Sequence, residues 1–455
     1  MTSSTPTSRR AFLRTGVALP FLGTSALLTM SHNAQAADYK AIVVLYLSGG
    51  HDGNNMLIPV DGAYADYQRA RPALALPKDN LARIGGRHIG HDFALSPACR
   101  PLVDLFERQR LAIVANVGAL VQPTTIDEVK NRTAHLPPFL GSHAEQEQWT
   151  QGWMGDVDPS GWGGRAIDLL PAEMRNYQPL IAIARDYTAV TAPVTPLSLA
   201  SSNSSTYWGR ANINDPNDQV HQRLEWLSRM QSTNVYEQEF ARSLRTSYLD
   251  AIEFGRGQAF GAEPAGNYPD SELGRGLRFL ARHIPFSKQV GARRQVYLVQ
   301  EGRYDTHAGQ MSTDPQNPGM EMLLGSVAQS LVAFDQSMAG VGMGDEVLVL
   351  VLSEFGRTLD PAAGQGSDHA WGNHWFAMGN SVKGGKIYGD KFPSLVVGGA
   401  DDASIWQPAR GQWLPQYSSD QFMADAFRWF GLSAQQCVTA MPNLGNFPSQ
   451  KIGYL

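Results

Sequence analysis

The chain has 455 residues, of which 43% are hydrophobic and 17% charged, and its formal net charge is −5. This weakly acidic balance excludes the basic field that nucleic-acid binding requires and a polybasic, membrane-directed surface. The two cysteines, Cys99 and Cys437, exclude a disulfide framework and a cysteine-rich metal site, and we expect each to be a buried thiol.

Residues 1–36 have the features of an export signal. Paired arginines, Arg9 and Arg10, precede the moderately apolar segment 17–30, and Ala34-Gln35-Ala36 fits a signal-peptidase site. The apolar segment is too short to span a bilayer, and no later stretch qualifies. We therefore expect a twin-arginine signal, the Tat translocon as the partner during export, and a mature protein of residues 37–455 that is periplasmic or secreted and forms one domain.

The first strand of the mature chain is predicted over 41–47, a continuous apolar run that ends in the turn Ser-Gly-Gly-His-Asp-Gly-Asn-Asn. The glycines allow a tight turn and close approach to a ligand, but the spacing is not that of a dinucleotide-binding loop. Asp52 in this turn is a candidate ligand for a metal or a substrate. The alternative is an Asx-turn aspartate that only caps the loop.

The next elements are a helix from Ser96 to Arg108 and a second core strand over 111–117. Ser142 is followed three residues later by Glu145, which is the spacing of a capping box, so a helix is expected to start at Ser142. Ser142 is therefore either a plain N-cap or a nucleophile held at a positive helix terminus.

Segment 219–260 has helical periodicity and predicts a helical cap inserted at about 201–282. A helix over 273–283 and a strand over 295–300 follow. Asp305 and His307 come directly after that strand. Both are candidate metal ligands.

The run 347–352 reads as a strand buried on both faces of a parallel sheet, preceded by a helix over 320–338. Glu354 and Arg357 follow it at once. A loop containing glycine then carries further candidate ligands, which are Asp368, His369 and His374. A salt-bridged loop in which Asp368 pairs with His369 is the alternative.

Open α/β sheets place their ligands beyond the carboxyl ends of their strands, so these clusters are expected to meet at one sheet edge. Carboxylates and imidazoles suit a divalent ion such as zinc or manganese, and carboxylates also suit calcium or magnesium.

Several motifs, in this order, resemble the DUF1501 family of exported bacterial proteins of unknown function. They are the paired arginines, the turn after the first strand, Gly-Ser-His at 141–143, Tyr-Asp-Thr-His-Ala at 304–308, Ser-Glu-Phe-Gly-Arg-Thr at 353–358, and Asp-His-Ala-Trp-Gly-Asn-His at 368–374. The family resembles the alkaline-phosphatase and sulfatase superfamily. The resemblance implies an α/β three-layer sandwich with a largely parallel central sheet, a helical insertion and metals at the strand ends.

By this resemblance Asp52 corresponds to the metal-binding Asp of the first strand, Ser142 to the nucleophile, and Asp305 with His307 to a later Asp and His pair. His369 or His374 would stand for the superfamily's last His. Two departures matter. Phe355 stands where the superfamily has a His, so the resemblance does not fix the number of metals, and Asp368, His369 and His374 are the nearby residues that could take its place. Leu102 and Val103 break the sulfatase Cys-x-Pro motif that Cys99-Arg100-Pro101 begins.

The resemblance and the ring of Asp and His residues lead us to expect an exported, metal-dependent hydrolase of phosphate or sulfate esters, with an unidentified small-molecule or polymer ester as its substrate. Ser142 or a metal-bound water would attack, and Arg357 would neutralise the transferred group unless it forms a structural salt bridge. The alternative, favoured by Phe355, is a non-catalytic exported binding or assembly protein that kept the fold.

Overall fold

The long apolar runs of the chain form the strands of one large sheet. The structure is a computed structural model that describes residues 38–152, 158–202, 207–208, 211–404 and 409–455, so the expected export signal lies outside the described residues. Residues Tyr39–Leu455 make up one compact unit. Among the described residues no helix is both long and apolar enough to cross a membrane.

The central sheet has the order β17-β5-β16-β13-β1-β10-β6-β7, with β18 beside β5. Strand β16 runs antiparallel to both of its neighbours, and the other pairings in this sheet are parallel. The strands are β1 Lys40–Leu47, β5 Leu111–Gly118, β6 Leu180–Ile183, β7 Leu197–Leu199, β10 Arg294–Glu301, β13 Val347–Leu352, β16 Asn373–Met378, β17 Lys386–Tyr388 and β18 Tyr417–Ser418.

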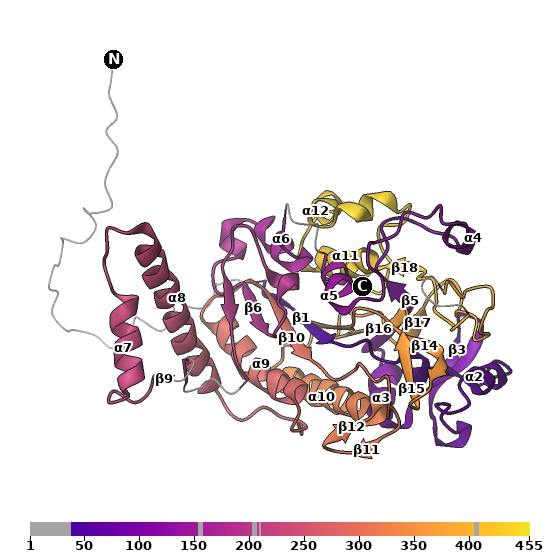
Figure 1. Ribbon diagram of the computed structural model, residues 1–455. Coiled ribbons are helices and arrows are strands. Elements are labelled where there is room, and N and C mark those ends of the chain that lie inside the picture. The colour runs from indigo at the N-terminus through magenta and orange to yellow at the C-terminus, as the bar shows by residue number, and fades with distance from the viewer. Residues whose placement is uncertain (1–37, 153–157, 203–206, 209–210, 405–408) are drawn as a thin grey trace. The chain divides into compact units, whose positions relative to one another are not determined.

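Helices cover both faces of this sheet because its central strands are buried on both sides. Alternate residues of β1 enter two different cores, with Val43 and Leu45 in one and Ile42 and Val44 in the other. Helices α3, α9 and α10 pack on the first face and α6, α11 and α12 on the second (Figure 1). The three-layer α/β sandwich with a largely parallel sheet is therefore confirmed.

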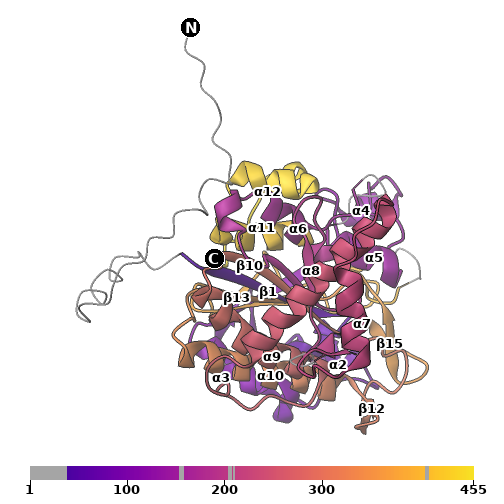
Figure 2. The same ribbon diagram turned by 90° about the vertical axis from the view of Figure 1, so that its left-hand side faces the viewer.

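The helices are α1 Gly53–Met56, α2 Tyr64–Ala70, α3 Pro101–Glu107, α4 Ile126–Lys130, α5 His143–Thr150, α6 Trp162–Asp168, α7 Gln219–Ser228, α8 Val235–Gln258, α9 Glu272–Gln289, α10 Met320–Gly340, α11 Ser419–Phe430 and α12 Ala434–Ala440. Helices α7 and α8 form the helical insertion, which faces the viewer in Figure 2. Smaller sheets lie outside the central sheet. One has three strands, which are β2 Leu57–Pro59, β3 Ala82–His88 and β4 His91–Leu95. The others are the pairs β8 Tyr207–Trp208 with β9 Ala211–Asn212, β11 Thr313–Asp314 with β12 Asn317–Pro318, and β14 Arg357–Ala362 with β15 Gly366–His369.

The predicted core strands at β1, β5, β10 and β13 are confirmed, and so is the helix α10 before β13. Two predictions are wrong in detail. The helix expected from Ser96 is broken at Arg100, because Pro101 starts a new helix, α3. The loop expected after Arg357 is instead the hairpin β14–β15 followed by β16, whose apolar residues pair with β5 and β13.

The register of the central strands brings their carboxyl ends to one edge. Leu47 at the end of β1 pairs with Glu301 at the end of β10, and Tyr46 pairs with Leu352 at the end of β13. The turn after β1 and the segments after β10 and β13 therefore start side by side.

Candidate functional site

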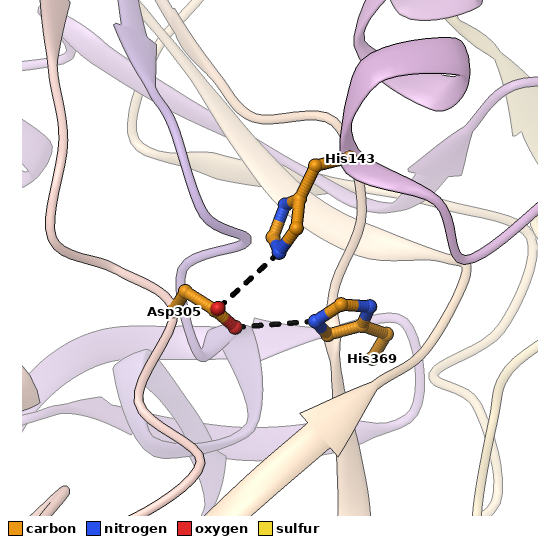
Figure 3. Close-up of side chains that lie close together, drawn as sticks. All are labelled: His143, Asp305 and His369. Atoms are coloured by element: carbon orange, nitrogen blue, oxygen red, sulfur yellow. Dashed lines mark hydrogen bonds and ion pairs between the residues drawn. The ribbon is translucent and has the colours of Figure 1, made fainter.

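Three side chains from distant parts of the chain meet at this edge (Figure 3). His143 is the first residue of α5, Asp305 follows β10, and His369 ends β15. One potential ligand atom from each lies within 4.8 Å of the others. The side chain of Asp305 is 43% exposed, so the group is open to solvent.

The Nε2 atoms of three histidines converge on the Asp305 carboxylate. They lie 3.4 Å away for His143, 3.1 Å for His369 and 3.0 Å for His307. The Nε2 atoms of His307 and His369 are also only 3.0 Å apart. Two imidazole nitrogens lie this close when one donates a hydrogen bond to the other or when both ligate a common cation.

The other nitrogen of each ring, Nδ1, has its own acceptor. That acceptor is the Glu354 carboxylate at 2.9 Å for His143, the Gly141 carbonyl at 2.6 Å for His369, and the Asp368 carboxylate at 2.8 Å for His307. An acceptor at Nδ1 keeps the proton there and leaves the Nε2 lone pair free, which is the arrangement of metal-binding histidines. The residues present therefore fit a divalent metal.

Glu354 lies behind His143 and is fully buried. Its Oε1 also accepts a hydrogen bond from the Gly49 backbone at 2.6 Å, whereas Oε2 has no hydrogen-bond partner among the described residues. An unpaired, buried carboxylate oxygen is costly in a structure without a cation nearby.

Arg357 holds the loops that carry the site. Its buried guanidinium donates to the carbonyls of Gly50, Ser367 and Tyr304 and reaches Asp305 Oδ1 at 2.6 Å. Because its donors are engaged with the protein, these contacts favour the structural salt bridge over direct contact with a transferred group.

Charge pairing shifts two pKa values in this group. Hydrogen bonds to Asp305 and Glu354 raise the pKa of His143 to about 9. Burial alone would raise the pKa of Asp305, but hydrogen bonds from His143, His369 and Arg357 outweigh it and lower that pKa well below its ordinary range. Without a metal, the group therefore holds a proton on His143 opposite an ionised Asp305.

Asp52 lies elsewhere, fully buried against Arg71, with 2.5 Å between Oδ2 and the guanidinium. Its carboxylate also accepts hydrogen bonds from Gln310 and from the Asn54 backbone. The contact with Asn54 is the Asx-type cap that the sequence left as the alternative. The structure does not bring Asp52 together with Asp305.

His374 is also outside the group, in the core strand β16. Its Nδ1 accepts a hydrogen bond from the Asn116 backbone at 3.2 Å, and burial lowers its pKa to about 3. Such a neutral, buried ring packs between Phe392 and Trp413.

Ser142 is the N-cap of α5, as predicted, but its side chain does not cap the helix. Its Oγ donates to the carboxylate of Glu145, so the reciprocal capping box is not formed. The hydroxyl thus lies directly before His143 in the chain and is paired with a proton acceptor.

Of the metal ligands expected from the sequence, Asp305, His307 and His369 come together. Glu354 contacts the Nδ1 of His143, and Asp368 contacts the Nδ1 of His307. His143 was missed. Its signal is in the Gly-Ser-His motif at 141–143, where an imidazole directly follows the candidate nucleophile.

The family model of DUF1501, described as "Protein of unknown function (DUF1501)", matches residues 39–395. No curated protein matches the chain. Among solved structures, the PsFucS1 sulfatase from Pseudoalteromonas sp. is 10% identical with a TM-score of 0.35, covering 87% of this chain and 68% of that one. The phosphonate monoester hydrolase of Agrobacterium radiobacter is 12% identical with a TM-score of 0.29, covering 88% and 84%. The lipoteichoic acid synthase LtaP from Listeria monocytogenes is 8% identical with a TM-score of 0.31, covering 78% and 68%. Likenesses with such TM-scores are too distant to indicate a reaction.

Proposed function

Because the chain belongs to the DUF1501 family, described only as proteins of unknown function, we propose a function from its own side chains: an exported, metal-dependent hydrolase of phosphate or sulfate esters. The observation that carries this proposal is the convergence of three imidazole Nε2 atoms on Asp305, each with its Nδ1 proton committed to an acceptor.

His143, His307, His369 and Asp305 would hold the ion. Three imidazoles and one carboxylate are a set that zinc or manganese prefers, whereas calcium and magnesium take oxygen ligands. Glu354, Asp368 and the Gly141 carbonyl keep the three rings in the tautomer that presents Nε2.

A bound divalent ion supplies Lewis-acid polarisation of the ester oxygen and a lowered pKa for the attacking hydroxyl. The protein supplies a nucleophile, either Ser142 or a water, and orientation of the site through Arg357. Glu145, in contact with the Ser142 hydroxyl, is placed to take its proton. Phosphate and sulfate esters suit such a site because negative charge builds on their non-bridging oxygens.

The second candidate is a non-catalytic exported binding or assembly protein that kept the fold. Phe355 favours it. The Phe355 ring is buried, and its centroid lies 4.5 Å from the His369 ring and 5.0 Å from the His143 ring. An apolar ring therefore fills the place where the related superfamily has a further ligand.

Elemental analysis and an ester panel test the two candidates on the protein purified after export. We expect about one zinc or manganese per chain, lost in His307→Gln and His369→Gln but kept in His135→Gln, a change at an exposed histidine. Ser142→Ala should keep the metal and abolish ester hydrolysis if the serine attacks, and leave hydrolysis intact if water attacks. A wild-type protein that holds no metal and cleaves no phosphate or sulfate ester would overturn the hydrolase and favour the binding protein.

Export is tested separately, because the signal lies outside the described residues. Replacing Arg9 and Arg10 together by Lys should leave uncleaved precursor in the cytoplasm, since a twin-arginine signal is read by its arginine pair. Cell fractionation and immunoblotting measure this. Normal export of the double variant would contradict the Tat route.

A further inference from the structure

A cavity with a mixed polar and apolar lining lies at the same sheet edge as the proposed metal-binding group, which consists of His143, Asp305, His307 and His369. It has a volume of about 500 Å³ and lies beyond the carboxyl ends of the parallel strands β1, β10, β6 and β7. Its walls include Ser48 after β1, Arg185 after β6, Ser202 after β7, and Gln300 with Arg303 from β10 and the segment after it.

The charge of this cavity is positive although the whole chain is acidic. Among the described lining residues are three arginines, at positions 185, 275 and 303, and one carboxylate, that of Glu272. Arg275 also pairs with the exposed Asp270 at 2.5 Å. No carboxylate of the described residues pairs with Arg185 or Arg303. Guanidinium groups left without a carboxylate in a concave site favour an anionic ligand, because their planar fork matches the oxygens of phosphate, sulfate or carboxylate.

The cavity and the metal-binding group are built from the same chain segments. Arg303 stands two residues before Asp305, and its backbone has a φ of +80°, a conformation that residues with side chains rarely adopt. Ser48 precedes Gly49, which donates to Glu354. Gln300 links the two sites, because its amide donates to Glu147 on the His143 helix while its carbonyl oxygen accepts from the Arg185 backbone.

We propose that this cavity binds a second anionic group of the substrate, so that the ester is a polyanion with a phosphate, sulfate or carboxylate group besides the one that is hydrolysed. The statement that the bound anion is part of a substrate rests on the proposed hydrolase function, whereas anion binding in the cavity needs no metal. The arginine side chains recognise the non-reacting group and orient the scissile ester toward Asp305.

Isothermal titration calorimetry with two small polyanions, sucrose octasulfate and inositol hexakisphosphate, tests the proposal and separates sulfate from phosphate preference. We expect the wild type to bind at least one probe. Arg185→Gln and Arg303→Gln should each weaken that binding roughly tenfold, since each removes one charge-assisted contact. Arg223→Gln, the same charge change at an exposed position of α7, should leave it unchanged.

A second variant reverses the charge in the cavity without removing an arginine. Gly302 lines the cavity, and a Cβ there would meet nothing within 4 Å, so Gly302→Glu should fold and abolish probe binding. His369→Gln should lose metal yet keep probe binding, which separates this inference from the proposed function. Loss of probe binding in His369→Gln, an equal loss in Arg223→Gln, or no probe binding by the wild type would overturn the cavity as the anion site.

Discussion

At the scale of single residues, Glu354 is placed to orient His143, a proposed metal ligand, and not to bind the metal itself. Its Oε1 is committed to the Nδ1 of His143 and to the Gly49 backbone. We expect Glu354→Gln to weaken metal binding by about 10–100-fold without abolishing it, the usual cost of losing such a partner. Competition with a chromophoric chelator measures the affinity, and Glu173→Gln at an exposed site is the control. Complete loss of metal, as in a variant of a histidine ligand, would instead make Glu354 a ligand.

Asp420, in α11, offers a pH test away from the proposed metal-binding group. Burial raises its pKa to about 7, although Arg165 acts in the opposite direction. Between its ordinary pKa near 4 and about 7, the native state holds a proton that the unfolded state releases, so this residue makes stability fall as pH rises, by up to about 1.4 kcal/mol per pH unit. Asp420→Asn should therefore gain stability relative to wild type between pH 5 and pH 7.

Urea unfolding at the two pH values measures this gain. Asp79→Asn, at an exposed aspartate, should show no such trend. A constant difference between Asp420→Asn and wild type across this window would mean that Asp420 is already ionised in the native state.

At the scale of elements, the turn after β1 is built to let the Asp305 segment pass close by. Gly49 has a φ of +117°, and a Cβ there would lie 2.4 Å from the Asp305 backbone nitrogen. Gly49→Ala should destabilise the protein by at least about 2 kcal/mol, because it adds a clash to an unfavourable φ. It should also lower metal content, since Asp305 must move.

Denaturant unfolding and elemental analysis measure the two effects. The control is Gly62→Ala, where an added Cβ meets nothing within 4 Å. Metal content that is unchanged in a destabilised Gly49→Ala protein would show that the turn does not position Asp305.

At the scale of the whole molecule, two large hydrophobic cores lie on the two faces of the central sheet, whereas the helical insertion of α7 and α8 is thinly packed. The insertion is centred on a small cluster around Tyr248 and Ala251, and large apolar side chains such as Trp226 and Tyr236 remain exposed on it. Elements with few buried apolar contacts unfold locally at a lower cost in free energy. We expect amides of α7 and the first half of α8 to exchange with deuterium well before those of β1, β10 and β13. Hydrogen exchange with mass spectrometry measures this, α10 is the internal helical control, and equal protection of α7 and α10 would contradict it.

The sequence by itself determined the core strands β1, β5, β10 and β13 and places where candidate ligands gather. Apolar runs such as 347–352 are buried on both faces in a parallel sheet, so their local pattern is sufficient. Asp305 and His307 follow from their position directly after a predicted strand, and His369 was singled out as an imidazole in the segment after β13. Ser142 likewise marked the start of α5, although the capping box that predicted this start is not formed.

Only the tertiary structure decided which of these side chains meet. His143 joins Asp305 from a helix more than 150 residues earlier, Arg71 neutralises Asp52, and pairing of β16 with β5 takes His374 into the core. Each outcome depends on strand register and on contacts between segments distant in the chain. Hydrophobic periodicity reports whether a residue is buried, but it does not report its partner, and for a carboxylate or an imidazole the partner decides between a metal ligand, a salt bridge and a neutral core residue.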